Sequence, residues 1–234
     1  MSLPRVGFVD NGFAIGFAMR GTGIKVSRFQ GAFWEQGIDK MMRSWLDKQY
    51  ILTIDYDTYF TQYHVVDLYN IMERNPEVDV LFPMQTKRNG GAPMFQAHQF
   101  LTGKKMDDGA DEMKSSLKNW SKDYIEADSG HFGLTIIRTE CLKKLDKPWL
   151  EGKANKDGEW EFGKIDPDMS FWYNCQKNNV KVALAPTVYI GHLEQFCSIP
   201  GRPQDSFKTF YLTADDVTRN VWPLWAQPKS AAET

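Results

Sequence analysis

The chain has 234 residues, of which 42% are hydrophobic, so it is long and apolar enough to form a sizeable core and is not expected to be disordered. Its 28 basic and 30 acidic residues give a formal net charge of −2, which excludes a global attraction to nucleic acid or to anionic membranes. The three cysteines, Cys141, Cys175 and Cys197, form no C-x-x-C pair, so neither a disulfide framework nor a cysteine zinc site is expected.

No segment near the start of the chain is predicted to cross a membrane or to direct secretion. The longest apolar stretch there, residues 12–19, is far shorter than the roughly 20 residues that a membrane helix needs. No basic segment of the kind that is typical of a signal peptide precedes it. We therefore expect a cytoplasmic protein without a membrane span.

Strand and helix patterns alternate along the chain. Short apolar runs bounded by polar or turn residues predict strands at residues 5–9, 50–54, 78–82, 132–138 and 180–184. Apolar residues at helical spacing predict helices at residues 36–48, 64–75, 140–145 and 169–178. This alternation predicts an α/β fold, in which helices cover both faces of a mainly parallel sheet and form a single three-layer αβα domain.

Two regions interrupt this alternation. Residues 86–128 and 149–164 are rich in glycine and charge, and long irregular insertions of this kind are typical of functional loops. Residues 200–234 are predicted to form a C-terminal arm that packs on the domain, with its last residues frayed. The predicted division is therefore a domain of residues 1–199 followed by this arm.

The predicted strand at residues 50–54 runs directly into two carboxylates, Asp55 and Asp57. Ligands of open α/β sheets bind at the carboxyl ends of strands, so both acids are expected where a substrate lies. An Asp-x-Asp triplet is frequent by chance, so it is the position of this one, directly after a buried strand, that indicates a functional role. Two carboxylates at a buried strand end are costly unless a cation compensates them, and Mg²⁺ or Mn²⁺ prefers such oxygen ligands.

With this motif the sequence resembles a known family. A strand that ends in Asp-x-Asp is similar to the metal-binding signature of GT-A-fold glycosyltransferases, particularly the family 2-like enzymes of bacteria and their phages. Three further segments follow in the order that the family shows. Residues 129–138, followed by a short helix and Pro148-Trp149, resemble the border of the acceptor site. Residues 166–171 resemble the Glu-Asp-x-x-Phe segment, and residues 188–192 resemble the strand that ends in Gly-His.

The resemblance covers roughly residues 24–193 and implies a GT-A, nucleotide-diphospho-sugar transferase-like fold. It implies that Asp55, Asp57 and His192 hold Mn²⁺ or Mg²⁺ beside the diphosphate of a UDP- or GDP-sugar. Asp57 is the first choice for direct ligation, and Asp55 could instead face the ribose or bind the metal through water. Asp168 would be the general base of an inverting transfer to a glycan or other hydroxyl acceptor. Asp166 is the alternative base, because Pro167 stands where the family has glutamate. The remaining site residues would be Asp10 near the nucleotide base and, on the acceptor side, Gly130, His131, Phe132 and Trp149.

Ordinary structural roles remain open for these residues. Asp55 could cap the helix that starts near Thr61, and Asp10 could form an Asx-turn. His192 could be a hydrogen-bonded histidine at a sheet edge. Either Asp166 or Asp168 could cap the helix at residues 169–178.

The aromatic residues near the predicted acceptor site could stack on sugar faces, although core packing is the commoner role of such side chains. The candidates are Phe132, Trp149, Trp160 and Trp172.

Two other functions also remain open. A nucleotidyltransferase brings carboxylates and a metal to strand ends as well, but residues 20–25, the candidate phosphate loop, lack a Walker lysine arrangement. A non-catalytic carbohydrate-binding or structural protein could use the same fold, because fold alone does not determine function.

Overall fold

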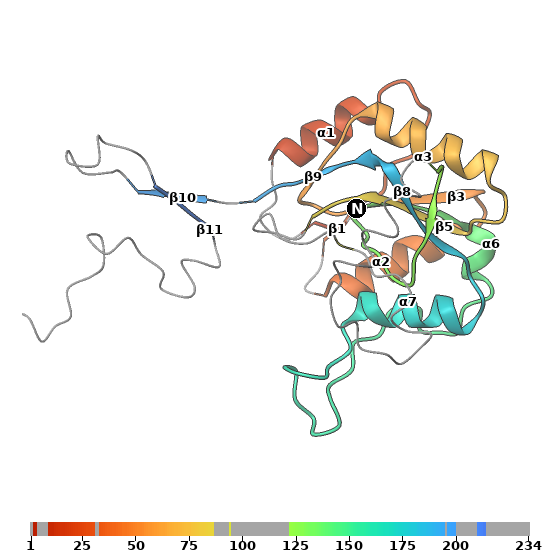
Figure 1. Ribbon diagram of the computed structural model, residues 1–234, viewed down its shortest axis with the longest axis vertical. Coiled ribbons are helices and arrows are strands. Elements are labelled where there is room, and N and C mark those ends of the chain that lie inside the picture. The colour runs from red at the N-terminus through yellow and green to blue at the C-terminus, as the bar shows by residue number, and fades with distance from the viewer. Residues whose placement is uncertain are drawn as a thin grey trace, which may run out of the picture.

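A five-stranded mixed sheet lies at the centre of the computed structural model, which describes residues 2–3, 9–30, 33–86, 94, 122–194, 196–199 and 210–213 (Figure 1). Its strands are, in spatial order, β3 (Tyr50–Ile54), β7 (Leu134–Arg138), β5 (Val80–Met84), β8 (Val182–Tyr189) and β6 (Ile125–Glu126). Strands β3, β5 and β8 run in one direction, whereas β7 and β6 run in the other.

The predicted α/β class is confirmed, and the sheet is mixed. Of its four neighbouring strand pairs, only β5 and β8 are parallel. Strand β7 lies between β3 and β5 and pairs antiparallel with both. The apolar runs that predict strands carry no information on direction, and the long segment between β5 and β7 allows the chain to return either way.

Helices pack against both faces of the sheet (Figure 1). On one face, α1 (Val9–Met19) and α3 (Gln62–Arg74) cover Leu81, Ala183 and Ile136. On the other face, α2 (Trp34–Arg43), α6 (Thr139–Leu142) and α7 (Pro167–Lys177) cover a core that includes Phe82 and Leu184. Alternate residues of β5 and β8 belong to different cores, as expected for central strands that are apolar on both sides.

Helix α3 forms for the reasons that its sequence predicts. It ends at Arg74, just before Asn75 and Pro76, and it buries Val65, Leu68, Ile71 and Met72. Its N-cap residue is Thr61, whose backbone N–H donates to Nδ1 of His64 at 2.9 Å. Asp55 therefore does not cap this helix.

The N-terminal prediction is wrong where it can be compared with the structure. Residues 5–8 of the predicted first strand lie outside the described residues, but Val9 already begins α1. Asp10 consequently lies in the first helical turn instead of an Asx-turn. The helix forms because Asn11, Ala14, Ile15 and Ala18 share one face, which is buried against the sheet and α3.

Short strand pairs complete the description. Strand β1 (Ser2–Leu3) pairs parallel with β2 (Phe29–Gln30), and β4 (Thr58–Tyr59) pairs antiparallel with β9 (Gly191–His192). Strand β10 (Phe196–Ile199) pairs antiparallel with β11 (Phe210–Thr213). The predicted arm and the insertion at residues 86–128 otherwise lie largely outside the described residues, and the boundary at residue 199 stays a prediction. No helix in the described ranges is long and apolar enough to cross a membrane.

Candidate functional site at the end of strand β3

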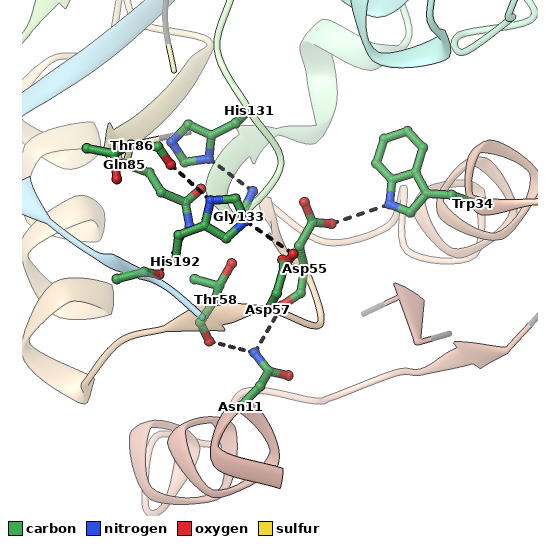
Figure 2. Close-up of polar contacts among 11 residues, drawn as sticks. Asn11, Trp34, Asp55, Asp57, Thr58, Gln85, Thr86, His131, Gly133 and His192 are labelled. Atoms are coloured by element: carbon green, nitrogen blue, oxygen red, sulfur yellow. Dashed lines mark hydrogen bonds and ion pairs between the residues drawn. The ribbon is translucent and has the colours of Figure 1, made fainter. Parts of the chain in front are cut away.

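The turn that follows β3 is held in place by backbone and amide hydrogen bonds (Figure 2). The N–H of Asp55 donates to the carbonyl of Gly133 on the neighbouring strand at 3.1 Å. From α1, the side-chain amide of Asn11 donates to the carbonyls of Asp55 at 3.0 Å and of Thr58 at 2.6 Å. Since Asn11 is only 1% exposed, helix α1 fixes the backbone that carries both acids.

Asp57 and His192 lie together at this turn, although 135 positions separate them in the chain. The pairing of β4 with β9 brings them together, and the N–H of Leu193 also donates to the carbonyl of Asp57 at 2.7 Å. Nε2 of His192 lies 3.1 Å from Oδ2 of Asp57, and Nδ1 lies 2.9 Å from the carbonyl of Thr86. The two side chains are only 11% and 7% exposed, so the contact is largely shielded from water.

Each nitrogen of the His192 ring lies next to an oxygen atom, and these contacts limit where its protons can be. A backbone carbonyl only accepts hydrogen bonds, so the contact with Thr86 places a proton on Nδ1. In a neutral ring Nε2 then carries a lone pair and no proton, and it faces a carboxylate, which likewise only accepts hydrogen bonds. Either a second ring proton or a cation between Nε2 and Oδ2 satisfies both atoms. The 3.1 Å separation fits both states, since it is an ordinary N–H···O distance and also brings two possible cation ligands together.

Asp55 does not join this pair. Its Oδ1 accepts a hydrogen bond from the indole N–H of Trp34 at 3.3 Å, and its carboxyl group points toward that side chain (Figure 2). Among the residues that the structure describes, no three His, Cys, Asp or Glu side chains are grouped to hold a metal. The predicted set of three ligands is therefore not assembled, and two of its members, Asp57 and His192, meet.

The charges of Asp57 and His192 nevertheless act on Asp55 and change its pKa. Burial, and then the charge of Asp57, raise the pKa of its carboxyl to about 6, against the hydrogen bond from Trp34 and the opposing effect of His192. The charge of Asp168 acts in the raising direction too. Asp168 on α7 thus lies within electrostatic range of Asp55.

The two candidate bases differ in their surroundings. Asp166 is the N-cap residue of α7, is exposed, and forms an ion pair with Lys164 at 3.0 Å. Asp168 is partly buried, and its Oδ1 accepts the N–H of Met169 at 2.8 Å. Burial raises the pKa of Asp168, with a further contribution from the charge of Asp166.

The predicted acceptor-side residues are mostly packed inside the protein. Phe132 and Trp149 are 2% and 1% exposed and belong to the core, and the same holds for Trp172, so none of these rings is available for stacking on a sugar. His131 is buried as well: its Nε2 lies 2.9 Å from the carbonyl of Pro83, and its Nδ1 accepts the N–H of Gly133. Trp160, in contrast, is 61% exposed.

The glycines of this segment make room for neighbouring side chains. A Cβ on Gly130 would lie 2.5 Å from the ring of Phe82. A Cβ on Gly133 would lie 2.6 Å from Oε1 of Gln85, 2.9 Å from His131 and 3.0 Å from Thr58. Their smallness therefore serves protein packing beside the site.

Several residues of the site were missed by the sequence analysis. They are Asn11, Trp34, Thr58 and Gln85, whose amide donates to the carbonyl of Gly191 at 3.2 Å. Oδ1 of Asn11 and Oγ1 of Thr58 are buried and have no hydrogen-bond partner among the described residues. The available signal was a polar residue, Asn11, amid the apolar stretch that forms α1.

A cavity of about 360 Å³ opens along β3 and reaches the site at Asp55. Its walls come from the loop at residues 23–27, from helix α2 and the turn after it, and from β3. Trp45 lies in the wall, where its indole N–H donates to Ser27 at 2.9 Å. The ammonium groups of Lys25 and Lys48 lie 6.0 and 5.9 Å from the Trp45 ring. The cavity thus combines an apolar wall and two cationic groups around Trp45 with the carboxyl group of Asp55, which lines it beyond the other end of β3.

Comparisons with known proteins identify no family. No protein-family model and no curated protein matches the chain. Among solved structures, the chain is similar to "A197 from STIV", with a TM-score of 0.47 and 12% identity over 91% of this chain and 92% of that one. It is also similar to "GalNAc-T7 with UDP, GalNAc and Mn2+", with a TM-score of 0.45 and 14% identity over 77% of this chain. The match covers 34% of that second protein, so this chain spans about a third of its length.

Proposed function

We propose that this chain is a metal-dependent glycosyltransferase of the GT-A type, which transfers a sugar from a nucleotide-diphosphate sugar to a hydroxyl acceptor. The observation that carries the proposal is the shielded contact between Asp57 and His192, in which a ring nitrogen and a carboxylate oxygen, both of them ligands that a divalent cation accepts, lie 3.1 Å apart. The ordered segments that resemble this family support it. The supporting residues lie where the strands of an α/β sheet end, which is the usual position of ligands in such folds.

Asp57 and His192 fit a divalent cation as two of its ligands. Mg²⁺ and Mn²⁺ are commonly held by one or two side chains together with phosphate oxygens of a substrate. When bound, the cation would act as a Lewis acid that neutralises the charge developing on the diphosphate leaving group. Because the protein supplies only two ligands from its described residues, we expect metal and nucleotide to bind together much more tightly than either binds alone.

The cavity along β3 is the proposed site of the donor nucleoside. The Trp45 ring, with Lys25 and Lys48 beside it, offers an apolar and cationic surface to a base. Asp55, at the end of the cavity, is placed to accept a hydrogen bond from a ribose hydroxyl. Asp10 is exposed on α1 while its neighbour Asn11 contacts the turn, so the proposed donor site excludes Asp10.

Asp168 is the proposed general base. It is partly buried and acts electrostatically on Asp55, whereas Asp166 is exposed and paired with Lys164. A carboxyl with a raised pKa accepts the proton of an attacking hydroxyl more readily than an ordinary one. The exposed Trp160, in the loop that precedes α7, is the remaining aromatic candidate for the acceptor side.

Calorimetric titration with UDP and GDP, each with and without Mn²⁺, tests the proposal. Wild-type protein is expected to bind one of these nucleotides in a metal-dependent manner, and Asp57→Asn is expected to weaken this binding by roughly 100-fold. Asp157→Asn, in an exposed loop, is the matched control and should leave binding unchanged. Metal-dependent binding that survives in Asp57→Asn would overturn the assignment.

The products of the reaction distinguish the remaining alternatives. A glycosyltransferase releases a nucleoside diphosphate from a nucleotide sugar, whereas a nucleotidyltransferase releases pyrophosphate. Absence of any metal-dependent nucleotide binding would favour a non-catalytic carbohydrate-binding or structural protein. The donor nucleotide, the acceptor and a cytoplasmic location stay predictions.

A further inference from the structure

Helix α1 exposes an apolar face to solvent. Val9, Phe13 and Phe17 are 72%, 61% and 69% exposed, while the opposite face of the helix is buried. The exposed rings of Phe13 and Phe17 stack on each other, with their centroids 6.4 Å apart. A surface helix ordinarily carries charged or polar side chains on its outer face, so this face is expected to have a partner.

The neighbouring helix extends the apolar surface. Helix α3 lies beside α1 on the same face of the sheet (Figure 1). Its exposed residues include Tyr63, at 80%, and Val66, at 43%. Stable protein interfaces bury about 800 Å² on each partner, more than one short helix offers, and this second helix supplies additional area.

The shape of the α1 face suits another helix. Gly12 and Gly16 are exposed, and a Cβ built on either one meets no atom within 4 Å. Because neither residue has a side chain, they leave a low strip one turn long on the helix surface next to Phe13 and Phe17. Residues at i and i+4 line up in this way on a helix, and the grooves that they leave accommodate the side chains of a packed helix.

The charges on this face indicate which helix is bound. Asp10 lies in the first turn of α1 and Arg20 in the turn just after its last residue, and neither forms an ion pair with another described residue. Between them the sequence carries no charge. A partner helix with the same two charges in the opposite direction would therefore complement this face.

We propose that α1 packs against α1 of a second copy of this chain, antiparallel and about a two-fold axis. In such a pair, centred between Ala14 and Ile15, Phe13 is level with Gly16 of the second copy and Phe17 is level with its Gly12. Asp10 is then offset from Arg20 of the second copy by one residue, about 1.5 Å along the helix axis. One surface thus matches itself in both shape and charge, as a two-fold interface requires.

Size-exclusion chromatography with light scattering, over roughly a hundred-fold range of protein concentration, tests this proposal. Wild-type protein is expected to form dimers. Gly16→Leu fills the low strip, and its dissociation constant for the dimer is expected to rise at least about 10-fold. Because a Cβ at Gly16 meets no neighbour and leucine favours helix formation, the melting temperature of the monomer should rise. Loss of the dimer therefore cannot be attributed to misfolding.

Two further variants make the test specific. Gln36→Leu adds an exposed leucine to α2, on the opposite face of the sheet, and should leave the dimer intact. Asp10→Lys should weaken the dimer, and the double variant Asp10→Lys/Arg20→Asp should restore it. A wild-type chain that stays monomeric, with or without binding to phosphatidylcholine or phosphatidylserine vesicles, would overturn the proposal, and so would a Gly16→Leu protein that dimerises as tightly as wild type.

Discussion

Strands β3 and β7 carry a polar cluster at each end, and the two clusters differ in how completely their hydrogen bonds are satisfied. At the start of β3 lies the Arg138 cluster, formed by Arg138, Tyr50, Glu73 and nearby backbone carbonyls. The guanidinium donates to the carbonyl of Val78 at 2.8 Å, to that of Met72, and to the hydroxyl of Tyr50 at 2.6 Å. Tyr50 in turn donates to Glu73 at 2.6 Å. Donors and acceptors alternate along the whole chain of contacts.

At the other end of β3 lies the carboxylate cluster, formed by Asp55, Asp57 and His192. Here Nε2 of His192 faces a carboxylate oxygen and needs a proton or a cation between them, and buried oxygens of Asn11 and Thr58 nearby have no partner among the described residues. The Arg138 cluster is complete without any ligand, so its role is to hold α3, β3 and β7 together. The carboxylate cluster needs a cation or a proton to be complete, and this difference is what separates a structural cluster from a binding site.

The largest expected loss of stability follows from a substitution in the Arg138 cluster. Arg138→Met leaves the carbonyls of Val78 and Met72 without their donor, which should lower the free energy of unfolding by about 4 kcal/mol. Urea unfolding followed by tryptophan fluorescence measures this loss. Arg74→Met removes an arginine whose ion pair with Asp123 is exposed, and should cost no more than about 1 kcal/mol. Equal losses in the two variants would show that the Arg138 cluster has no special structural role.

His131, which lies beside the carboxylate cluster, should make the stability of the protein depend on pH. Burial lowers the pKa of its ring to about 4 in the folded protein, from about 6.5 in the unfolded chain. Between these values the unfolded chain binds more protons, so stability that is present above about pH 6.5 is lost as the pH falls toward 4, by about 3 kcal/mol. The slope of unfolding free energy against pH should be shallower in His131→Gln. A variant with the wild-type slope would contradict the assignment.

Gly133→Ala is expected to have an intermediate effect. The added Cβ would press on Gln85, His131 and Thr58, at a cost of about 2 kcal/mol in unfolding free energy. Gly12→Ala, measured at protein concentrations where the proposed dimer is dissociated, is the matched control, because its Cβ meets no atom and should stabilise the monomer by up to about 1 kcal/mol. Thermal unfolding of both variants measures the difference. A Gly133→Ala protein as stable as wild type would mean that the side chains around Gly133 can shift at little cost.

The sequence predicted the elements that carry strong local signals. The apolar run of β3 leading into Asp55 and Asp57, and helix α3 ending at Asn75, both follow from residue type and spacing over short distances. The direction of β7 depends on how the chain returns across the sheet, which no local pattern records. Helix α1 was missed because it is apolar on both faces, so it lacks the polar stripe from which a surface helix is recognised.

The candidate site was predictable only in part for a related reason. Asp57 and His192 each follow an apolar run, so both were expected at strand ends. The orientation of the Asp55 side chain depends on a hydrogen bond from Trp34, and the position of its backbone carbonyl depends on a hydrogen bond from Asn11. These contacts join segments 21 and 44 positions apart, and a single sequence without homologues does not show which distant residues meet.

The smallest expected effect on stability comes from a substitution in the carboxylate cluster. In the presence of a chelator, Asp57→Asn should change the free energy of unfolding by less than about 1 kcal/mol, since the new amide can donate to Nε2 of His192 where a carboxylate could not. Addition of Mn²⁺ with the preferred nucleotide should then stabilise wild type and leave the variant unchanged. The opposite result, a loss of about 3 to 5 kcal/mol without metal, would mean that a buried imidazolium–carboxylate pair holds this end of the sheet together. In that case the two clusters would both be structural, and the contrast between them would not mark a binding site.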